Sequence, residues 1–354
     1  MLLTRTTRTK PWRRWAAVLS AATLGVGLLA GCGSDSSDSA DKASSGNSAA
    51  AGGAFPVTVE HAFGSTKITK APERVVTVGY TDDQTVLAFG TKPVGMVDQY
   101  PNPAGKSPDI NTQWPWVKDK WGSTRPEVVM KNGDSGPNYE KIAALRPDLI
   151  IAVYSEVDRA AYDKLSRIAP TVGRTKGEKE PFSAPWQDNA LQIAKALGRA
   201  EEGEKMIADV QDQLAAAKKA HPEFARETAV ALSWYENSVA PFTSTDVRGR
   251  LVSGIGFPYR TEIDKVADGS FYTKLSPERI DLVDVDRIFV INDTADTAAL
   301  KKFKLFTNLD AVKNGKVSYL PDSEGSAVGA AISQGTLLSM PYAIDELVKS
   351  AGQV

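Results

Sequence analysis

The chain has 354 residues, with 42 Lys and Arg against 43 Asp and Glu, and its formal net charge is −1 at pH 7. A chain without a basic excess is a poor nucleic-acid binder, and its single cysteine excludes an internal disulfide. About 300 residues remain beyond the leader described next, which is enough to bury a core and to form two lobes.

The first 31 residues have the pattern of a secretory signal peptide. An apolar run from Trp15 to Ala30 is short for a membrane span, which needs about 20 apolar residues. It ends in small residues directly before Cys32, which is typical of a lipoprotein signal. We therefore expect a signal peptide over 1–31 and a lipid on Cys32. Five basic residues precede the apolar run: Arg5, Arg8, Lys10, Arg13 and Arg14.

The expected lipid is a diacylglyceryl group, with palmitate as a typical acyl chain. Two or more acyl chains give stable attachment, so the body would stay at the extracytoplasmic face of the cell membrane without a transmembrane helix. Losing the five basic residues of the leader changes the net charge from −1 to about −6. The Arg13-Arg14 pair leaves both general and twin-arginine export open.

Residues 32–54 are rich in Ser, Ala, Gly and Asp and cannot bury a core, which predicts a disordered tether spanning about 25 Å. Residues 55–185 then alternate strand and helix patterns. This predicts an N-terminal α/β lobe with a mainly parallel sheet. The expected strands are 57–63, 74–79, 92–97, 148–153 and 170–172, and the expected helices are 83–89, 138–145 and 160–168.

Residues 186–222 carry almost no strand signal and predict a linking helical segment, which Gly198 divides. Residues 223–354 return to alternating patterns and predict a C-terminal α/β lobe. Ser276 is expected to cap a helix that begins at Pro277. The expected strands are 228–234, 287–291 and 316–320, and the expected helices are 250–255, 276–280 and 334–349.

The two lobes contain a weak repeat. Glu140 stands near a helix start and is followed by a basic residue and Ile, and Glu278 stands in the same context in the second lobe. In both lobes a buried strand follows. The repeat marks the two glutamates as equivalent positions.

The sequence lacks the signatures of common enzymes. Its two histidines, His61 and His221, have no partner at metal-ligand spacing. It contains neither a GxSxG elbow nor a Walker A loop. We therefore expect a protein that is not an enzyme and holds no catalytic residue, metal site or cofactor of its own.

Aromatic and cationic residues gather in the expected loops, where α/β proteins bind ligands. For each aromatic residue taken singly, a place in the core is favoured over a ligand contact. Together they suggest a cleft for a flat or apolar ligand, with an arginine as an anchor for ligand oxygens. The candidate ligand-binding residues are Tyr80, Trp114, Trp116, Tyr154, Trp186, Trp234, Tyr235, Arg248 and Arg250.

Strings spread over residues 71–350 carry a resemblance to a known family: APERVV from Ala71, FGTKPVG from Phe89, YEKIAALRPDLII from Tyr139, YDKLSRIAPTV from Tyr162 and LSMPYAID from Leu338. With them the chain resembles the class III substrate-binding proteins of ABC importers, which serve iron–siderophores, haem and cobalamin. The surroundings of Trp114 and Trp116 resemble the iron–siderophore branch and its actinobacterial lipoproteins. The resemblance implies two α/β lobes joined by a long helix, with the ligand cleft between the lobes.

The resemblance also implies the partners. Glu140 and Glu278 match the glutamates that dock on arginines of the membrane permease in this family. The cargo would be a ferric siderophore, expected to be of the hydroxamate type, whose iron is already coordinated, so the protein supplies no metal ligand. A monomer is expected. A haem or cobalamin receptor of the same fold is the alternative, and a cell-wall hydrolase lipoprotein is a more distant one.

Overall fold

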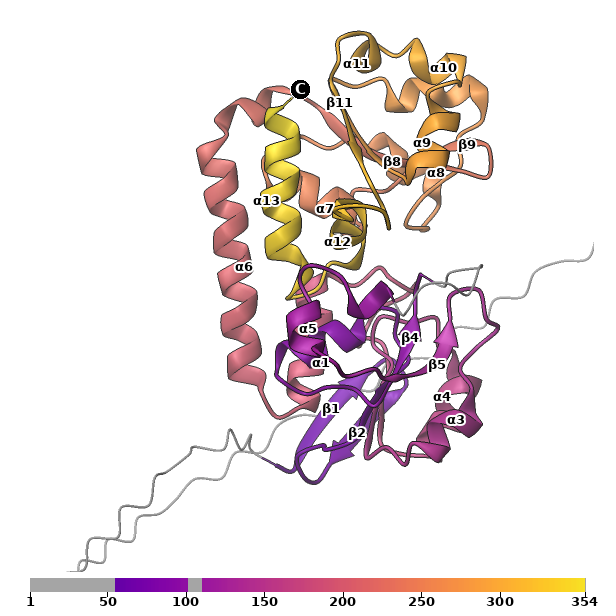
Figure 1. Ribbon diagram of the computed structural model, residues 1–354, viewed down its shortest axis with the longest axis vertical. Coiled ribbons are helices and arrows are strands. Elements are labelled where there is room, and N and C mark those ends of the chain that lie inside the picture. Colours follow the sequence, from indigo (N-terminus) through magenta and orange to yellow (C-terminus); the bar gives the residue numbers. More distant parts are fainter. Residues whose placement is uncertain (1–54, 101–109, 354) are drawn as a thin grey trace, which may run out of the picture. The chain divides into compact units, whose positions relative to one another are not determined.

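The computed structural model describes residues 55–100 and 110–353. The expected signal peptide, Cys32 and the tether lie outside the described residues. Within the described part, no helix is both long and apolar enough to cross a bilayer. Two α/β lobes, each built on its own sheet, confirm the predicted fold class (Figure 1).

The N-terminal lobe contains a five-stranded parallel sheet in the order β5-β4-β3-β6-β7. Its middle strand β3 (Val75–Thr77) is buried throughout, as expected for an unbroken β-branched run. An antiparallel hairpin of β1 (Val57–His61) and β2 (Gly64–Ile68) packs beside β7. The other strands are β4 (Gly95–Asp98), β5 (Glu127–Lys131), β6 (Leu149–Ile151) and β7 (Thr171–Val172).

The three helices predicted in this lobe are present as α1 (Asp82–Ala88), α3 (Tyr139–Ala144) and α4 (Arg159–Ser166). The side chain of Asn138 caps α3 by accepting a hydrogen bond from the backbone N–H of Lys141 at 3.0 Å. This cap accounts for the start of the helix at Tyr139.

The long connection around Trp114 contains structure that the sequence did not predict. It holds the 3-10 helix η1 (Ile110–Thr112), the short helix α2 (Lys118–Trp121) and the edge strand β5. Strand β5 begins with Glu127 and ends with Lys131, both exposed. Because both ends of the strand are charged, the sequence shows only three consecutive apolar residues here, which is too short a run to predict a strand.

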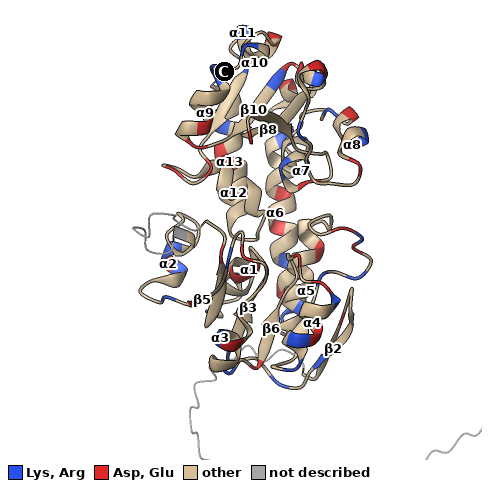
Figure 2. Cartoon of the chain, turned by 90° about the vertical axis from the view of Figure 1, so that its right-hand side faces the viewer, with Lys and Arg blue, Asp and Glu red and all other residues tan. Residues whose placement is uncertain are grey.

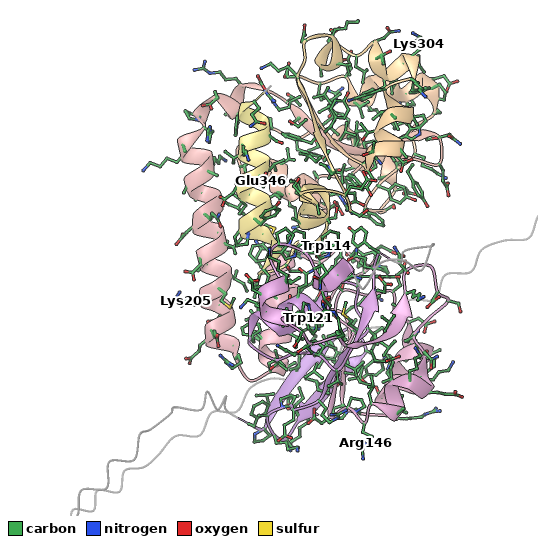
Figure 3. All side chains as sticks on the ribbon, viewed as in Figure 1. Trp114, Trp121, Arg146, Lys205, Lys304 and Glu346 are labelled. Atoms are coloured by element: carbon green, nitrogen blue, oxygen red, sulfur yellow. The ribbon has the colours of Figure 1, made fainter. Side chains whose placement is uncertain are left out.

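The helical segment divides as predicted. Helix α5 (Trp186–Ala196) packs against α1 and β1, and α6 (Ala200–Ala220) follows after Gly198, whose φ is +68°. Glycine adopts this left-handed conformation at low cost. Figure 1 shows α6 running beside both lobes, and Lys205 points from it into solvent (Figure 3).

The C-terminal lobe has a four-stranded sheet in the order β11-β10-β8-β9, in which only the edge strand β9 is antiparallel. Its strands are β8 (Ala229–Tyr235), β9 (Ser238–Pro241), β10 (Arg287–Ile291) and β11 (Val317–Leu320). Its helical elements are η2 (Pro222–Arg226), α7 (Val247–Gly254), α8 (Glu262–Ala267), η3 (Pro277–Val283), α9 (Thr294–Leu300), α10 (Lys304–Thr307), α11 (Asp310–Lys313), α12 (Val328–Gln334) and α13 (Ser339–Gly352).

Two predicted helices of this lobe were wrong in detail. The helix after Ser276 is the 3-10 helix η3, and the Ser276 side chain does not cap it. The closing helix does not begin at Gln334, where α12 ends. Gly335 has a φ of +55° and separates α12 from α13. The predicted helix therefore spans the end of one helix and most of the next.

The lobes meet in an aromatic cluster. Trp114 is 3% exposed and packs with Leu87 and Met96 of the N-terminal lobe and with Ala327 and Ala330 beside or within α12. Figure 3 shows Trp114 where the two parts of the chain come together. Burial of this large side chain stabilises the junction, because it removes apolar surface of both lobes from water.

A buried polar network lies at the same junction. The side-chain amide of Gln84 in α1 donates a hydrogen bond to Oε1 of Gln334 in α12. Its oxygen accepts one from the hydroxyl of Thr336 at 2.8 Å and one from Nε1 of Trp116 at 3.0 Å. Gln84 is 2% exposed, so one side chain of the N-terminal lobe satisfies polar groups of both lobes out of reach of water.

Candidate functional site

A cavity of about 640 Å³, here called the front cavity, opens between the lobes. Four parallel strands of the N-terminal sheet each contribute a residue that follows the carboxyl end of the strand, which is where α/β sheets place ligands. The N-terminal lobe contributes Tyr80 after β3, Gln99 after β4, Asn132 after β5, and Tyr154 and Glu156 after β6. The remaining walls are Phe182, Arg248, Phe271 and Ser333.

Arg248 lies on the C-terminal side of the front cavity. Its Nη1 donates to both carboxylate oxygens of Asp246, at 2.9 and 3.0 Å, and its Nε donates to the Ser333 hydroxyl at 3.1 Å. The guanidinium also lies 4.0 Å from the centre of the Phe242 ring. Nη2 has no hydrogen-bond partner among the described residues. Asp246 and Ser333 therefore fix the position of the guanidinium, and the N–H groups of Nη2 can donate to a ligand oxygen.

Tyrosines form the opposite wall. The hydroxyl of Tyr80 donates to Glu156 at 3.1 Å. Burial, followed by the negative charge of Glu156, raises the pKa of Tyr80 to about 12. Burial also raises the pKa of Tyr154. Both phenols are therefore neutral hydrogen-bonding groups at physiological pH.

Asp82 holds the loop that carries Tyr154. Its carboxylate accepts the backbone N–H groups of Val153 at 2.8 Å and Tyr154 at 3.0 Å. A Cβ on Gly79 would lie 2.0 Å from this carboxylate, so only glycine fits there. Asp82 is 1% exposed, and burial raises its pKa to about 6. The carboxyl serves to position the cavity wall.

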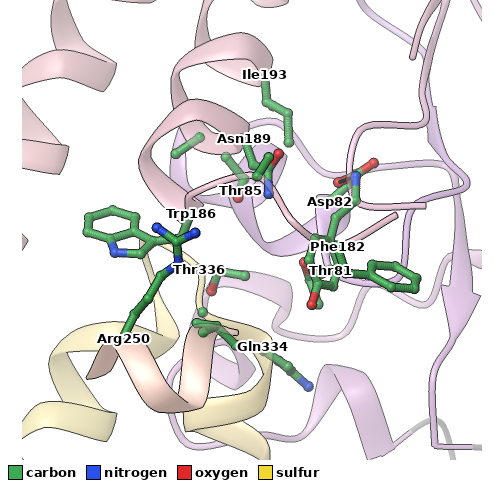
Figure 4. A pocket seen from close by; sticks show the side chains of 15 residues that line it. Thr81, Asp82, Thr85, Phe182, Trp186, Asn189, Ile193, Arg250, Gln334 and Thr336 are labelled. Atoms are coloured by element: carbon green, nitrogen blue, oxygen red, sulfur yellow. Dashed lines mark hydrogen bonds between the residues drawn. The ribbon is translucent and has the colours of Figure 1, made fainter. Parts of the chain in front are cut away.

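A second hollow, here called the rear cavity, lies behind Tyr154 and Phe182, which line both cavities. It comprises about 460 Å³, and its lining includes Trp186 of α5 and Arg250 of α7 (Figure 4). Nη2 of Arg250 donates to the backbone oxygen of Ser183 at 3.4 Å. Arg250 thus links α7 to the loop before α5.

Five of the nine predicted ligand-binding residues line the two cavities. Tyr80, Tyr154 and Arg248 line the front cavity, and Trp186 and Arg250 line the rear cavity. The other four lie elsewhere. Trp114 and Trp116 stack on each other at 5.4 Å in the lobe junction, Trp234 is buried against Phe303, and Tyr235 is 48% exposed beside Tyr272.

Six residues of the front cavity were missed by the sequence analysis. Gln99 and Glu156 could have been found, because each stands just beyond a predicted strand and carries a polar side chain. Asn132 directly follows β5, which the sequence did not predict. Phe182, Phe271 and Ser333 stand in segments whose position only the tertiary structure determines. No His, Cys, Asp and Glu group suited to a metal ion occurs within the described part of the chain.

The two equivalent glutamates lie at helix starts. Glu140 is exposed in the first turn of α3, and Glu278 is exposed in the first turn of η3. A backbone hydrogen bond and then a hydrogen bond with Ser276 lower the pKa of Glu278. Figure 2 shows both signs of charge on both lobes.

Comparison with known proteins identifies a family and a relative of similar length. Residues 75–324 match the model of the periplasmic binding protein family. A probable siderophore-binding lipoprotein of Bacillus subtilis strain 168, YfiY, is 27% identical over 328 residues, covering 89% of this chain and 93% of the relative.

Two solved structures share the fold. A periplasmic solute binding protein from Mycobacterium smegmatis has a TM-score of 0.72 and 29% identity, with 84% of this chain and 98% of the other covered. PiaA of Streptococcus pneumoniae TIGR4, solved in complex with ferrichrome, has a TM-score of 0.68, 28% identity and the same coverage.

Proposed function

Because the chain belongs to the family of periplasmic binding proteins, we propose that it is the solute-binding component of an ABC importer and that its ligand is a ferric siderophore of the hydroxamate type. The charge balance of the front cavity carries this proposal. Among the described residues that line the cavity, Arg248 is the one cation and Glu156 the one anion, and Arg248 is already paired with Asp246.

This balance favours an uncharged ligand. A ferric complex of three hydroxamates is neutral, because three negative groups offset Fe³⁺. A complex rich in free carboxylates needs several cations in the cavity, since a buried charge without a partner is costly. The tyrosine and phenylalanine walls suit the carbon scaffold of a siderophore, and Nη2 of Arg248 suits an iron-bound hydroxamate oxygen.

The siderophore fills the coordination sphere of its iron, so the protein needs to supply no ligand. A haem receptor of the same fold, the alternative, would need a Tyr or His on the iron. Burial keeps the phenols of Tyr80 and Tyr154 protonated, which disfavours them as iron ligands in the free protein. His61 and His221 line neither cavity. A cobalamin receptor needs no such ligand and is the other alternative.

We infer a binding role rather than catalysis, and so set the cell-wall hydrolase aside. The relative YfiY is named a siderophore-binding lipoprotein, and PiaA was solved with ferrichrome. Both names support a receptor. The front cavity also offers hydrogen-bond donors and aromatic faces in positions that suit holding a ligand.

The remaining parts of the proposal concern attachment to the membrane and docking on the permease. A lipid on Cys32 and the tether 32–54 would keep a monomeric body near the membrane, where Glu140 and Glu278 would dock on arginines of the permease. A carboxylate is stabilised at a helix start and pairs well with arginine. The exposure of both glutamates leaves them available to a partner.

Titration of the protein with ferric complexes tests the ligand. Ferrichrome should quench tryptophan fluorescence, since Trp186 lines the rear cavity directly behind the ligand walls. Ferric citrate and haem should bind much more weakly. A response to haem or cobalamin with none to ferrichrome would replace the proposed ligand with that alternative.

Transport tests the docking glutamates. The double change Glu140→Ala and Glu278→Ala should leave ferrichrome affinity unchanged and abolish uptake into cells. Glu201→Ala with Glu204→Ala on the exposed face of α6 is the matched control, because it removes the same charge from another surface. Uptake that survives in the first variant would remove the docking role.

A further inference from the structure

A chain of aromatic rings crosses the front cavity from one lobe to the other. In the N-terminal lobe, the ring of Phe182 lies 5.8 Å from that of Tyr80 and 4.8 Å from that of Tyr154, between centroids. On its other side it meets Phe271 of the C-terminal lobe edge-to-face, at 5.9 Å and 86°. Phe182 is therefore the ring that spans the opening between the lobes.

The backbone of Phe182 is strained. Its φ is +69°, in the left-handed region that bulky residues rarely adopt. Such a conformation persists only where the surroundings hold it, and it is found most often at sites that bind or switch.

The residues after Phe182 are held from both lobes. The carboxylate of Glu178 accepts the backbone N–H groups of Ser183 at 3.2 Å and Ala184 at 3.4 Å. Arg250, from α7 in the C-terminal lobe, donates to the carbonyl oxygen of Ser183. The backbone is therefore fixed around Phe182, and the side chain is the part that can turn by rotation about its own χ angles.

We propose that Phe182 is a gate of the ligand cleft: its ring meets Phe271 across the front cavity, and this contact must open before a ligand enters or departs. The ring also forms part of the wall between the front and rear cavities. Rotation of the ring away from Phe271 would open the front cavity. This inference rests on the proposed function for its ligand, whereas the contact between Phe182 and Phe271 does not depend on which ligand binds.

The bridge is tested first without a ligand. The only cysteine of the chain is Cys32, so the chain from Gly33 onward can carry spin labels at Arg167→Cys in one lobe and Lys302→Cys in the other, both exposed positions. Phe182→Ala should broaden the distribution of distances between the labels. An unchanged distribution would overturn the bridge, whatever the ligand proves to be.

Capture kinetics then test the gate with ferrichrome. One edge-to-face ring pair corresponds to a factor of about two to ten in an equilibrium. Phe182→Ala should therefore raise the capture rate by about that factor, because the contact with Phe271 no longer has to break before ferrichrome enters. The release rate also reflects the contact that the ring makes with the ligand as part of the cavity wall, so the capture rate is the measure of the gate. A rise in the release rate alone would make Phe182 an ordinary ligand contact and overturn the gate.

Two further variants separate the ring from the backbone. Phe182→Gly also removes the ring but adopts the positive φ without strain. It should match Phe182→Ala in both assays and be the more stable of the two to urea. If only Phe182→Ala changes the rates, the backbone and not the ring is responsible, and the gate is wrong.

Phe63→Ala is the matched control for losing a half-buried phenylalanine. Phe63 stacks on Tyr162 at 4.9 Å within the N-terminal lobe. Its removal should lower stability and leave the label distances and ferrichrome rates as in the unchanged protein. The same broadening in this variant would show a general loosening instead of a bridge at Phe182, and would overturn the proposal.

Discussion

Replacing Gln84 by Leu should weaken the junction between the lobes more than any exposed substitution. Leu has a similar volume but neither donates nor accepts hydrogen bonds. It leaves Oε1 of Gln334 and the hydroxyl proton of Thr336 without their partner, and both residues are nearly buried, at 4% and 3% exposure. Each unpaired buried group costs about 1–3 kcal/mol, so the free energy of unfolding should fall by about 3 kcal/mol.

Urea unfolding followed by circular dichroism measures this loss, with the slope against urea kept as a check on the mechanism. The double variant Gln84→Leu with Gln334→Leu should cost less than the two single changes together, because it removes both partners of one hydrogen bond. Gln187→Leu, half-buried in α5, is the control. A loss below about 1 kcal/mol, or strict additivity, would refute the reasoning.

Three further outcomes are expected. Burial raises the pKa of Asp82 to about 6, so the folded protein binds its proton more tightly than the unfolded chain. The free energy of unfolding should therefore fall by roughly 3 kcal/mol as pH rises from about 4 to 7, and Asp82→Asn should flatten this dependence in urea titrations. Arg248→Lys keeps a charge beside Asp246 but loses the fork of donors, and calorimetry should show ferrichrome binding weakened about tenfold; unchanged affinity would remove the assigned contact. Asn138→Ala removes the cap of α3 and should cost about 1 kcal/mol in thermal unfolding, whereas no loss would show the cap to be dispensable.

Local signals in the sequence predicted much of the fold. Strand β10 has the predicted bounds Arg287–Ile291, because a fully buried parallel strand reads as an unbroken apolar run. Gly198 divides the helical segment at the predicted place, since its positive φ favours glycine. Strand β5 was missed because its ends are charged, and Gly335 was missed as the break before α13.

The candidate site was only partly predictable. Tyr80 and Tyr154 could be placed near the cavity, because ligands bind beyond the carboxyl ends of parallel strands. Trp114 satisfied the same loop criterion and is buried in the lobe junction instead. A large apolar ring is most stable where other apolar side chains can cover it. For Trp114, part of that cover comes from α12, more than 200 residues later in the chain.

The sequence by itself determined the elements and their class, because helix and strand periodicity, caps and glycine breaks act over a few residues. It also predicts a lipoprotein signal that ends at Cys32. Only the tertiary structure decided which rings meet across the cleft. Phe182 and Phe271 stand 89 positions apart in loops without a periodic pattern, and their contact depends on how two separately formed sheets pack around a common helix.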